Sequence, residues 1–345
     1  MLNHKLSEVE QEIVNMLFDD VEVSQPVKES TGKKQMLFTM QWEAGLHIPF
    51  DKQLLPTLQA ACEKGLYTVQ FFLGQKFSYK RTQLSDKDIQ ASQEFLTHYN
   101  MNVFTHAPYT INLAGSVDSL AWQGNTAIDT KVRQMIAALN HELRTVAQLS
   151  YYGNSGVVVH PGAFPKPEEG LQAIAHSINQ IEFCEDSMLL LENSAGEGNS
   201  LARDFEQIAT IIEGIDEEIL PHIGVCLDTA HIHGMGQYDL STIEGIDQML
   251  TDFDSMIGLE RLYLLHLNDS KVELGSRVDR HENLGEGRIW SESQESLRHL
   301  LQRIHEHRVS ICLETPNNKE LAAQGIQTSL MDMVKLQRLW EETQN

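Results

Sequence analysis

The chain has 345 residues, of which 41% are hydrophobic and 22% charged, and its formal net charge is −23. This composition is typical of a globular protein, because a disordered chain has too few apolar residues to form a core. The acidic charge excludes a surface that binds nucleic acid everywhere, since phosphate contacts need lysine and arginine. Residues 73–88 carry four basic and two acidic side chains, so any nucleic-acid contact is expected on one face only.

The N-terminal sequence and the cysteines indicate an intracellular protein that is not secreted. No stretch reaches the roughly 20 apolar residues that a membrane span needs, so no membrane association is expected. Acidic residues such as Glu8 stand early in the chain, where a signal peptide would be apolar. The four cysteines are widely separated, and Cys226 and Cys312 fall in apolar runs. This usage is typical of free core thiols in a reducing compartment.

Residues 1–35 predict a short N-terminal helical extension. Ser7 and Glu10 match a capping box, and apolar residues around them recur at helical spacing. We expect an amphipathic helix and a polar linker that precede the main domain and pack on its exterior. A segment that docks a partner protein is the alternative.

From residue 36 onward, short apolar runs alternate with segments of helical periodicity. Runs of branched and aromatic residues predict strands buried on both faces, as in an all-parallel sheet. Strands are predicted at 37–46, 66–72, 102–106, 156–160, 188–192, 223–228, 262–266 and 309–313. Helices are predicted at 51–64, 85–98, 124–151, 168–184, 201–214, 241–257, 291–307 and 319–342. Strands that are each followed by a helix predict an α/β fold, a (β/α)8 TIM barrel that forms one domain over residues 36–345.

Six of the predicted strands end on a residue that can bind a metal. These residues are His106, His160, Glu192, Asp228, His266 and Glu314. The carboxyl ends of all barrel strands meet at one rim, where α/β barrels build their active sites. The strand ends therefore predict a common metal site.

Two local pairs add further candidate ligands to this rim. His231 follows Asp228 by three residues, and Asp279 and His281 stand two apart, which brings the set to five histidines and four carboxylates. One zinc ion takes about four ligands, so this set predicts two or three metals that share a bridging carboxylate. Closely spaced metals stabilise both the attacking and the leaving oxygen of a phosphoryl displacement.

Longer motifs around these residues resemble the endonuclease IV family of zinc-dependent apurinic/apyrimidinic (AP) endonucleases, AP endonuclease family 2, which have a (β/α)8 barrel. The resemblance covers about residues 45–335. The motifs are Asn193-Ser-Ala-Gly196, Leu227-Asp-Thr-Ala-His231, His266-Leu-Asn-Asp-Ser-Lys271, Gly275-Ser-Arg-Val-Asp-Arg-His281 and Leu284-Gly-Glu-Gly287.

The resemblance implies a site of three zinc ions, with Mn²⁺ as an alternative occupant of one position. The first zinc would be held by His106 and His160, with Glu192 bridging to the second zinc. The remaining ligands would be Asp228, His266 and Glu314 for the second zinc, and His231, Asp279 and His281 for the third.

The resemblance also implies hydrolysis of the phosphodiester 5′ to an abasic site in duplex DNA, which leaves a 3′-hydroxyl and a 5′-deoxyribose phosphate. Trimming of blocked 3′ ends is a further activity that it implies. Glu314, Glu192 and Asp228 are the expected catalytic residues, with Glu314 orienting or deprotonating the attacking water. We expect the protein to act as a monomer.

Substrate contacts are expected on loops at the same rim. The resemblance implies DNA contacts at Gln75, Lys76 and Tyr109, although Tyr109 could instead pack its own loop. Lysine at position 76, followed by Phe77 and Ser78, departs from the arginine and aromatic residue common in the family, and lysine lacks the planar stacking surface of arginine. Further candidates for phosphate contact are Lys271, Ser276, Arg277 and Arg280, for which ion pairs with Asp279 or Glu282 are the alternative.

Two histidines near the predicted ligands are expected to bind no metal. His47 ends the first strand, where we expect it to support the ligands from behind. His233 follows His231 by two residues and could line the same pocket.

Two other functions remain open from the residues alone. A metal-dependent sugar isomerase or epimerase would share the barrel and a strand-end metal site, but it has no evident use for the Asp279-Arg-His281 motif. A protein that binds abasic lesions without cleaving them is the second alternative, and the complete ligand set argues against it.

Overall fold

The computed structural model describes residues 43–50, 52–116, 126–150, 155–319 and 327–343. The predicted extension at residues 1–35 lies outside these ranges, as does the predicted start of the first strand before residue 43.

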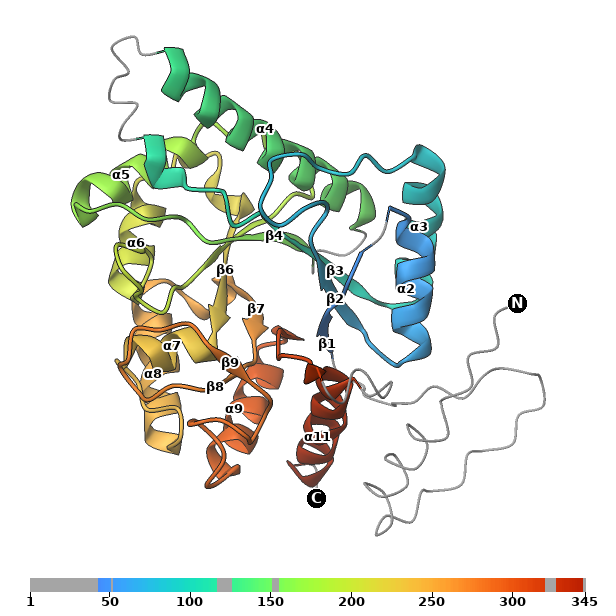
Figure 1. Cartoon of the computed structure of the whole chain (residues 1–345), viewed down its shortest axis with the longest axis vertical. Coiled ribbons are helices and arrows are strands. Elements are labelled where there is room, and N and C mark those ends of the chain that lie inside the picture. The colour runs from blue at the N-terminus through green and yellow to red at the C-terminus, as the bar shows by residue number, and fades with distance from the viewer. Residues whose placement is uncertain (1–42, 51, 117–125, 151–154, 320–326, 344–345) are drawn as a thin grey trace, which may run out of the picture.

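A closed barrel of eight parallel strands forms the centre of the described chain (Figure 1). Neighbouring strands pair in the order β1-β10-β7-β6-β5-β4-β3-β2, and β2 pairs with β1 to close the ring. The strands are β1 (Ala44–His47), β2 (Thr68–Phe71), β3 (Asn102–His106), β4 (Gly156–Val159), β5 (Leu189–Glu192), β6 (Ile223–Asp228), β7 (Leu262–His266) and β10 (Ser310–Leu313). The predicted TIM barrel is confirmed.

Helices surround the barrel strands (Figure 1). They are α2 (Leu54–Glu63), α3 (Asp86–Tyr99), α4 (Thr126–Leu149), α5 (Pro167–Ile178), α6 (Phe205–Glu213), α7 (Thr229–Met235), α8 (Ile243–Met256), α9 (Glu295–Glu306) and α11 (Thr328–Thr343). Side-chain caps fix several starts: Ser85 accepts from the Asp88 N–H at α3, and Asp204 accepts from the Gln207 N–H at α6. None of the described helices is long and apolar enough to cross a membrane.

The barrel buries two hydrophobic clusters, because each strand alternates its side chains between the two faces of the sheet. The larger cluster fills the space between strands and helices, and Val157 and Leu189 belong to it. The smaller cluster is formed by side chains on the other face of the same strands. It consists of Phe104, Val158, Leu190, Cys226, Leu264 and Cys312. This packed interior supports the ends of the strands, where the candidate ligands lie. The four cysteines are free, as predicted.

Three elements that build the rim, one helix and two short strands, were not predicted. The helix α7 begins directly after β6, with Asp228 as its cap. The short antiparallel pair of β8 (Asp269–Ser270) and β9 (His281–Glu282) folds the loop after β7 back on itself. This pair returns His281 to the rim.

Candidate metal centre

The strand ends bring the predicted ligands together because parallel barrel strands share one carboxyl edge. His106, Glu192, Asp228 and His266 are the last residues of their strands, and Glu314 directly follows β10. Three groups of ligand atoms result, within each of which all atoms lie less than 4.8 Å apart. The groups are His106, His160 and Glu192; Glu192, Asp228, His266 and Glu314; and Asp228, His231 and His281.

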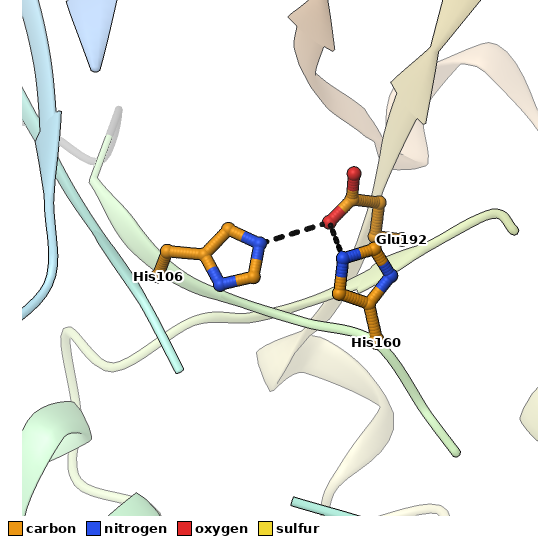
Figure 2. Close-up of side chains that lie close together, drawn as sticks. All are labelled: His106, His160 and Glu192. Carbon is orange, nitrogen blue, oxygen red and sulfur yellow. Dashed lines mark hydrogen bonds and ion pairs between the residues drawn. The ribbon is translucent and has the colours of Figure 1, made fainter. Parts of the chain in front are cut away.

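Glu192 lies between the first two groups and belongs to both. Its Oε2 lies 3.2 Å from Nε2 of His106 and 3.3 Å from Nε2 of His160 (Figure 2). Its Oε1 lies 3.0 Å from Nδ1 of His266. The two oxygens of one fully buried carboxylate therefore face different histidines, as a bridging ligand requires.

The second group places His266 against two further carboxylates. Nδ1 of His266 lies 3.4 Å from Oε2 of Glu314 and 3.9 Å from Oδ2 of Asp228. Asp228 also orders the next group, because its Oδ1 accepts the His231 N–H at 3.0 Å and so starts α7. One side chain therefore fixes the position of two candidate ligands.

The third group is more exposed and comes partly from the β8–β9 loop. Oδ2 of Asp279 lies 3.3 Å from Nε2 of His231, and its Oδ1 lies 3.2 Å from Nε2 of His281. Nε2 of His281 also lies 3.4 Å from Oδ2 of Asp228. The Asp279 backbone is held by its N–H, which donates to Glu197 at 2.9 Å. All nine predicted ligands thus lie in one cluster.

Hydrogen bonds to the outer ring nitrogens orient four of the five histidines. Nδ1 of His106 lies 2.7 Å from the Ala107 carbonyl, Nδ1 of His231 lies 2.8 Å from the Asn193 carbonyl, and Nδ1 of His281 lies 3.3 Å from the Glu314 carbonyl. Nε2 of His266 lies 2.9 Å from the side-chain oxygen of Gln70. In the neutral ring that a metal requires, the nitrogen that faces the cluster therefore carries the lone pair.

Two amide side chains that the sequence did not reveal hold the carboxylates. Nε2 of Gln70 donates to Oε1 of Glu314 at 2.6 Å. Asn268 donates to Oδ2 of Asp228 at 2.7 Å and accepts the Glu314 N–H at 2.8 Å. The only sequence signal for Gln70 is a large polar side chain between Val69 and Phe71 in a predicted buried strand. Asn268 stands in the His266-Leu-Asn motif.

Neighbouring histidines keep the Glu192 carboxylate ionised. Burial alone would raise the pKa of Glu192, but His160 and His266 outweigh it and hold the pKa well below its ordinary value. Burial would likewise lower the pKa of His266, but Glu314 and Glu192 raise it to about 9. Glu192 and His266 therefore stabilise each other's charged forms in the absence of a metal.

The residues present fit bound metal ions. Nε2 of His281 is buried and has no hydrogen-bond partner among the described residues, although carboxylates surround it. Buried polar atoms normally have a partner, and a metal ion would supply one. Imidazole and carboxylate together are the donors that zinc prefers.

His47 and His233 belong to none of the three ligand groups. Nδ1 of His47 lies 3.0 Å from Oε1 of Glu314 and 2.9 Å from the Gln70 amide, so His47 contacts a ligand from behind. Burial lowers the pKa of His47, against the opposing effect of Glu314. Nε2 of His233 lies 3.0 Å from the Val272 carbonyl, on the loop that leads to Asp279.

The predicted DNA-contact residues lie around this rim. Gln75 and Lys76 are exposed, and the Lys76 carbonyl accepts the Tyr109 N–H at 2.8 Å. Tyr109 is 45% exposed, and its ring centroid lies 5.3 Å from that of His106 and 5.8 Å from that of His160. It therefore borders the first ligand group and also reaches solvent.

The basic residues of the β8–β9 loop are exposed beside the third group. Arg280 lies 3.9 Å from Glu197, and Lys271 lies 3.5 Å from Glu282, so one of the two predicted alternative ion pairs is present. Ser276 and Arg277 are exposed, and Arg277 adopts a left-handed backbone with φ of 55°. Its N–H donates to the Gly234 carbonyl at 2.8 Å, which fixes the loop against α7.

The fold and this cluster define a TIM-barrel protein with a candidate metal centre at its strand ends. The family model described as "Xylose isomerase-like TIM barrel" matches residues 58–332. A Trichlorobacter lovleyi protein named probable endonuclease 4 is 32% identical over 295 residues, which are 83% of this chain and 97% of that protein. A Protochlamydia amoebophila protein of the same name is 38% identical over 269 residues, 76% of this chain and 88% of that protein.

A solved structure agrees with these relatives. The crystal structure of endonuclease IV from Thermus thermophilus superimposes with a TM-score of 0.69 at 26% identity, covering 87% of this chain and 99% of that one. The chain belongs to the endonuclease IV family. The resemblance found in the sequence motifs is confirmed.

Proposed function

We propose that this chain is a DNA-repair hydrolase that cuts the phosphodiester 5′ to abasic sites in duplex DNA. The observation that carries the proposal is Glu192, whose Oε1 and Oε2 face different histidines within a cluster of nine ligand-type residues. The names of the relatives, probable endonuclease 4 and endonuclease IV, support it.

The cluster would hold zinc, one ion for each of its three groups, with Mn²⁺ as an alternative in one of them. Asp279 would complete the third group, because it lies 3.3 Å from His231 and 3.2 Å from His281. When bound, such ions would supply positive charge that stabilises the attacking and leaving oxygens of the phosphoryl transfer.

Glu314 is the residue best placed to act on the attacking water. Its Oε1 is held by Gln70 and His47, its Oε2 faces His266, and its side chain keeps 13% exposure. It would orient the water and accept its proton while the water oxygen attacks phosphorus. The bond from phosphorus to the 3′ oxygen breaks, that oxygen takes a proton, and the products are a 3′-hydroxyl and a 5′-deoxyribose phosphate.

The surrounding rim would bind the DNA. Lys76 and Tyr109 lie on one side of the cluster, and Arg277 and Arg280 lie on the loop at the other side. An abasic nucleotide leaves the helix at low cost because it has no base pair to lose. The same hydrolysis at a blocked 3′ end would give the trimming activity.

A nicking assay tests the proposal. The substrate is a duplex with one abasic analogue, compared with the intact duplex of the same sequence, and metal content is measured on the same preparation. We expect a single nick 5′ to the lesion, three zinc ions per chain as the three groups require, and loss of cleavage with chelator. Zinc-loaded protein that leaves the abasic duplex uncut would overturn the proposal.

The same preparation separates the two alternatives. A sugar isomerase would bind fewer metals and would act on a ketose. In that case His231, Asp279 and His281 would hold no metal ion. A lesion-binding protein would hold the abasic duplex at nanomolar affinity without cutting it over hours.

A further inference from the structure

The loop between β2 and α3 is closed at its base by backbone pairing, and it lies beside the ligand cluster through its contact with Tyr109. Its two sides pair through an antiparallel bridge between Gly74 and Arg81, and the Thr82 N–H donates to the Leu73 carbonyl at 2.7 Å. We call its tip, residues 75–78, the substrate ledge.

The ledge presents an exposed aromatic ring to solvent. Phe77 is 66% exposed, more than any other large hydrophobic side chain in the described part of the chain. Its ring centroid lies 5.8 Å from that of Tyr109, and the Lys76 ammonium lies 5.2 Å from the Phe77 centroid. An exposed ring with a cation beside it is a surface on which nucleic-acid bases stack while the cation meets phosphate.

A buried ion pair lies beneath this exposed tip. Nη1 of Arg81 lies 2.9 Å from Oε1 of Glu142 on α4, and their side chains are only 3% and 0% exposed. A buried pair gains little net stability over well-packed apolar residues, because both charges lose their hydration. Its presence is better explained by what the guanidinium holds.

The guanidinium holds the backbone of the ledge from below. Nη2 of Arg81 donates to the Gln75 carbonyl at 2.8 Å and also to the Ser78 carbonyl. The Lys76 carbonyl accepts from the Tyr109 N–H at 2.8 Å. Both ends of the ledge and its centre are therefore fixed before any ligand arrives.

We propose that Arg81, itself held by Glu142, is a positioning residue that fixes the substrate ledge in its DNA-binding conformation. The fixed ledge presents Phe77 and Lys76 to the duplex without a loss of loop entropy on binding. This inference rests on the proposed function for its substrate, but the order of the ledge is a property of the free protein.

The test replaces the pair by apolar residues, Arg81→Met with Glu142→Met, so that no buried charge is left alone. On the abasic duplex we expect KM to rise roughly tenfold to a hundredfold as the ledge loses its preorganisation, with kcat within about twofold. Trypsin cleavage after Lys76 and Lys80 should accelerate by a similar factor, while the zinc content stays at the parent value.

A second variant, Arg81→Lys, separates charge from geometry. A lysine ammonium keeps the charge opposite Glu142, but it lacks the planar fork that reaches Gln75 and Ser78 at the same time. We expect KM and the rate of trypsin cleavage to rise here too, but by a smaller factor than in the double variant. If the double variant does not fold, this single variant still tests whether Arg81 positions the substrate ledge.

The matched control is the pair of Arg144 and Glu182, whose side chains are 57% and 68% exposed, with Arg144 on the same helix as Glu142. Replacing both by methionine should leave KM and trypsin cleavage unchanged.

Parent-like KM and trypsin resistance in the Arg81 variants would overturn the inference. If the parent protein itself fails to nick DNA, the proposed function fails, and trypsin cleavage alone still decides the role of Arg81.

Discussion

The side-chain oxygen of Gln70 lies 2.9 Å from Nε2 of His266. Because this contact takes the Nε2 proton of the neutral ring, Nδ1 is left to face Glu192 at 3.0 Å. The amide nitrogen of Gln70 meanwhile donates to Glu314 at 2.6 Å. One uncharged residue on β2 therefore orients two candidate ligands from β7 and β10.

Replacing Gln70 by leucine should weaken the second ligand group. Loss of a residue that orients metal ligands from behind typically costs about 10- to 100-fold in metal affinity or activity, and we expect a loss in that range. The measurement is zinc retained per chain during dialysis against graded chelator. Gln90→Leu, the same change at an exposed position on α3, is the control, and equal zinc retention in both variants would contradict the prediction.

Glu192→Ala should remove the metals of both groups that share this carboxylate. Several kcal/mol of transition-state stabilisation would be lost with them, and each 1.36 kcal/mol is about tenfold in rate. We expect a loss on the order of a thousandfold in nicking rate, together with a fall in zinc content. Parent-level zinc in this variant would exclude a bridging role for Glu192.

Asp279→Asn should affect the third group alone. Asp279 contacts His231 and His281 but neither His106 nor His266, so the variant should lose one zinc and keep the others. Nicking should fall while metal content drops by a third, in contrast to the deeper metal loss of Glu192→Ala. Identical metal content in the two variants would show that the groups do not load independently.

Zinc uptake by the metal-free protein should release protons. The pKa of His281 is about 9 because Asp228 and Asp279 outweigh the lowering effects of burial and His231, and the pKa of His266 is about 9 for the reason given above. Both rings are therefore protonated at pH 7 in the metal-free state, whereas ligands must be neutral. Calorimetric titration in buffers of different ionisation enthalpy measures the released protons, and buffer-independent heats would contradict the prediction.

The same shifts determine how the metal-free protein responds to pH. A histidine whose pKa is raised in the folded state stabilises that state fully when the pH is below 6.5, which is the pKa of histidine in the unfolded chain. This stabilisation is lost as the pH rises through about 9. Thermal unfolding in chelator should therefore show a falling Tm over this interval, and zinc-loaded protein should not show the same fall.

The barrel and the placement of its candidate ligands could be predicted because both follow short-range rules. The strand β6 (Ile223–Asp228) is apolar up to its last residue, which must lie at the carboxyl rim whatever the loops do. His160 and Glu314 stand one residue beyond the strands that the structure assigns, which changes nothing in their placement.

The supporting residues could not be predicted, because their partners are distant in sequence and chosen by packing. Gln70 meets His266 across 196 positions, and Arg81 meets Glu142 across 61. Nothing in local periodicity relates a buried polar residue to such a partner. The pairing of β8 with β9 involves two residues on each side, which is too short for an alternation pattern to appear.

Asp269 illustrates a motif whose role only the structure reveals. Its buried carboxylate accepts the N–H groups of Ser270 at 2.8 Å, Gly285 at 3.0 Å, Gly287 at 3.2 Å and Ile289 at 3.0 Å. It therefore joins the His266-Leu-Asn-Asp and Leu284-Gly-Glu-Gly motifs into one folded loop. A Cβ on Gly287 would lie 2.4 Å from Oδ1 of Asp269, which explains why glycine is needed there.

Asp269→Ala should destabilise this loop and the fold. Each buried donor left unpaired costs roughly 1–3 kcal/mol, and with partial relaxation we expect a loss of about 3 kcal/mol in the free energy of unfolding. Asp269→Asn, which keeps one carbonyl oxygen, should lose about half as much. Urea unfolding at fixed free zinc, followed by circular dichroism, measures both variants. The exposed Asp186 provides the control, and equal stability of Asp269→Ala and Asp186→Ala would contradict the role assigned to Asp269.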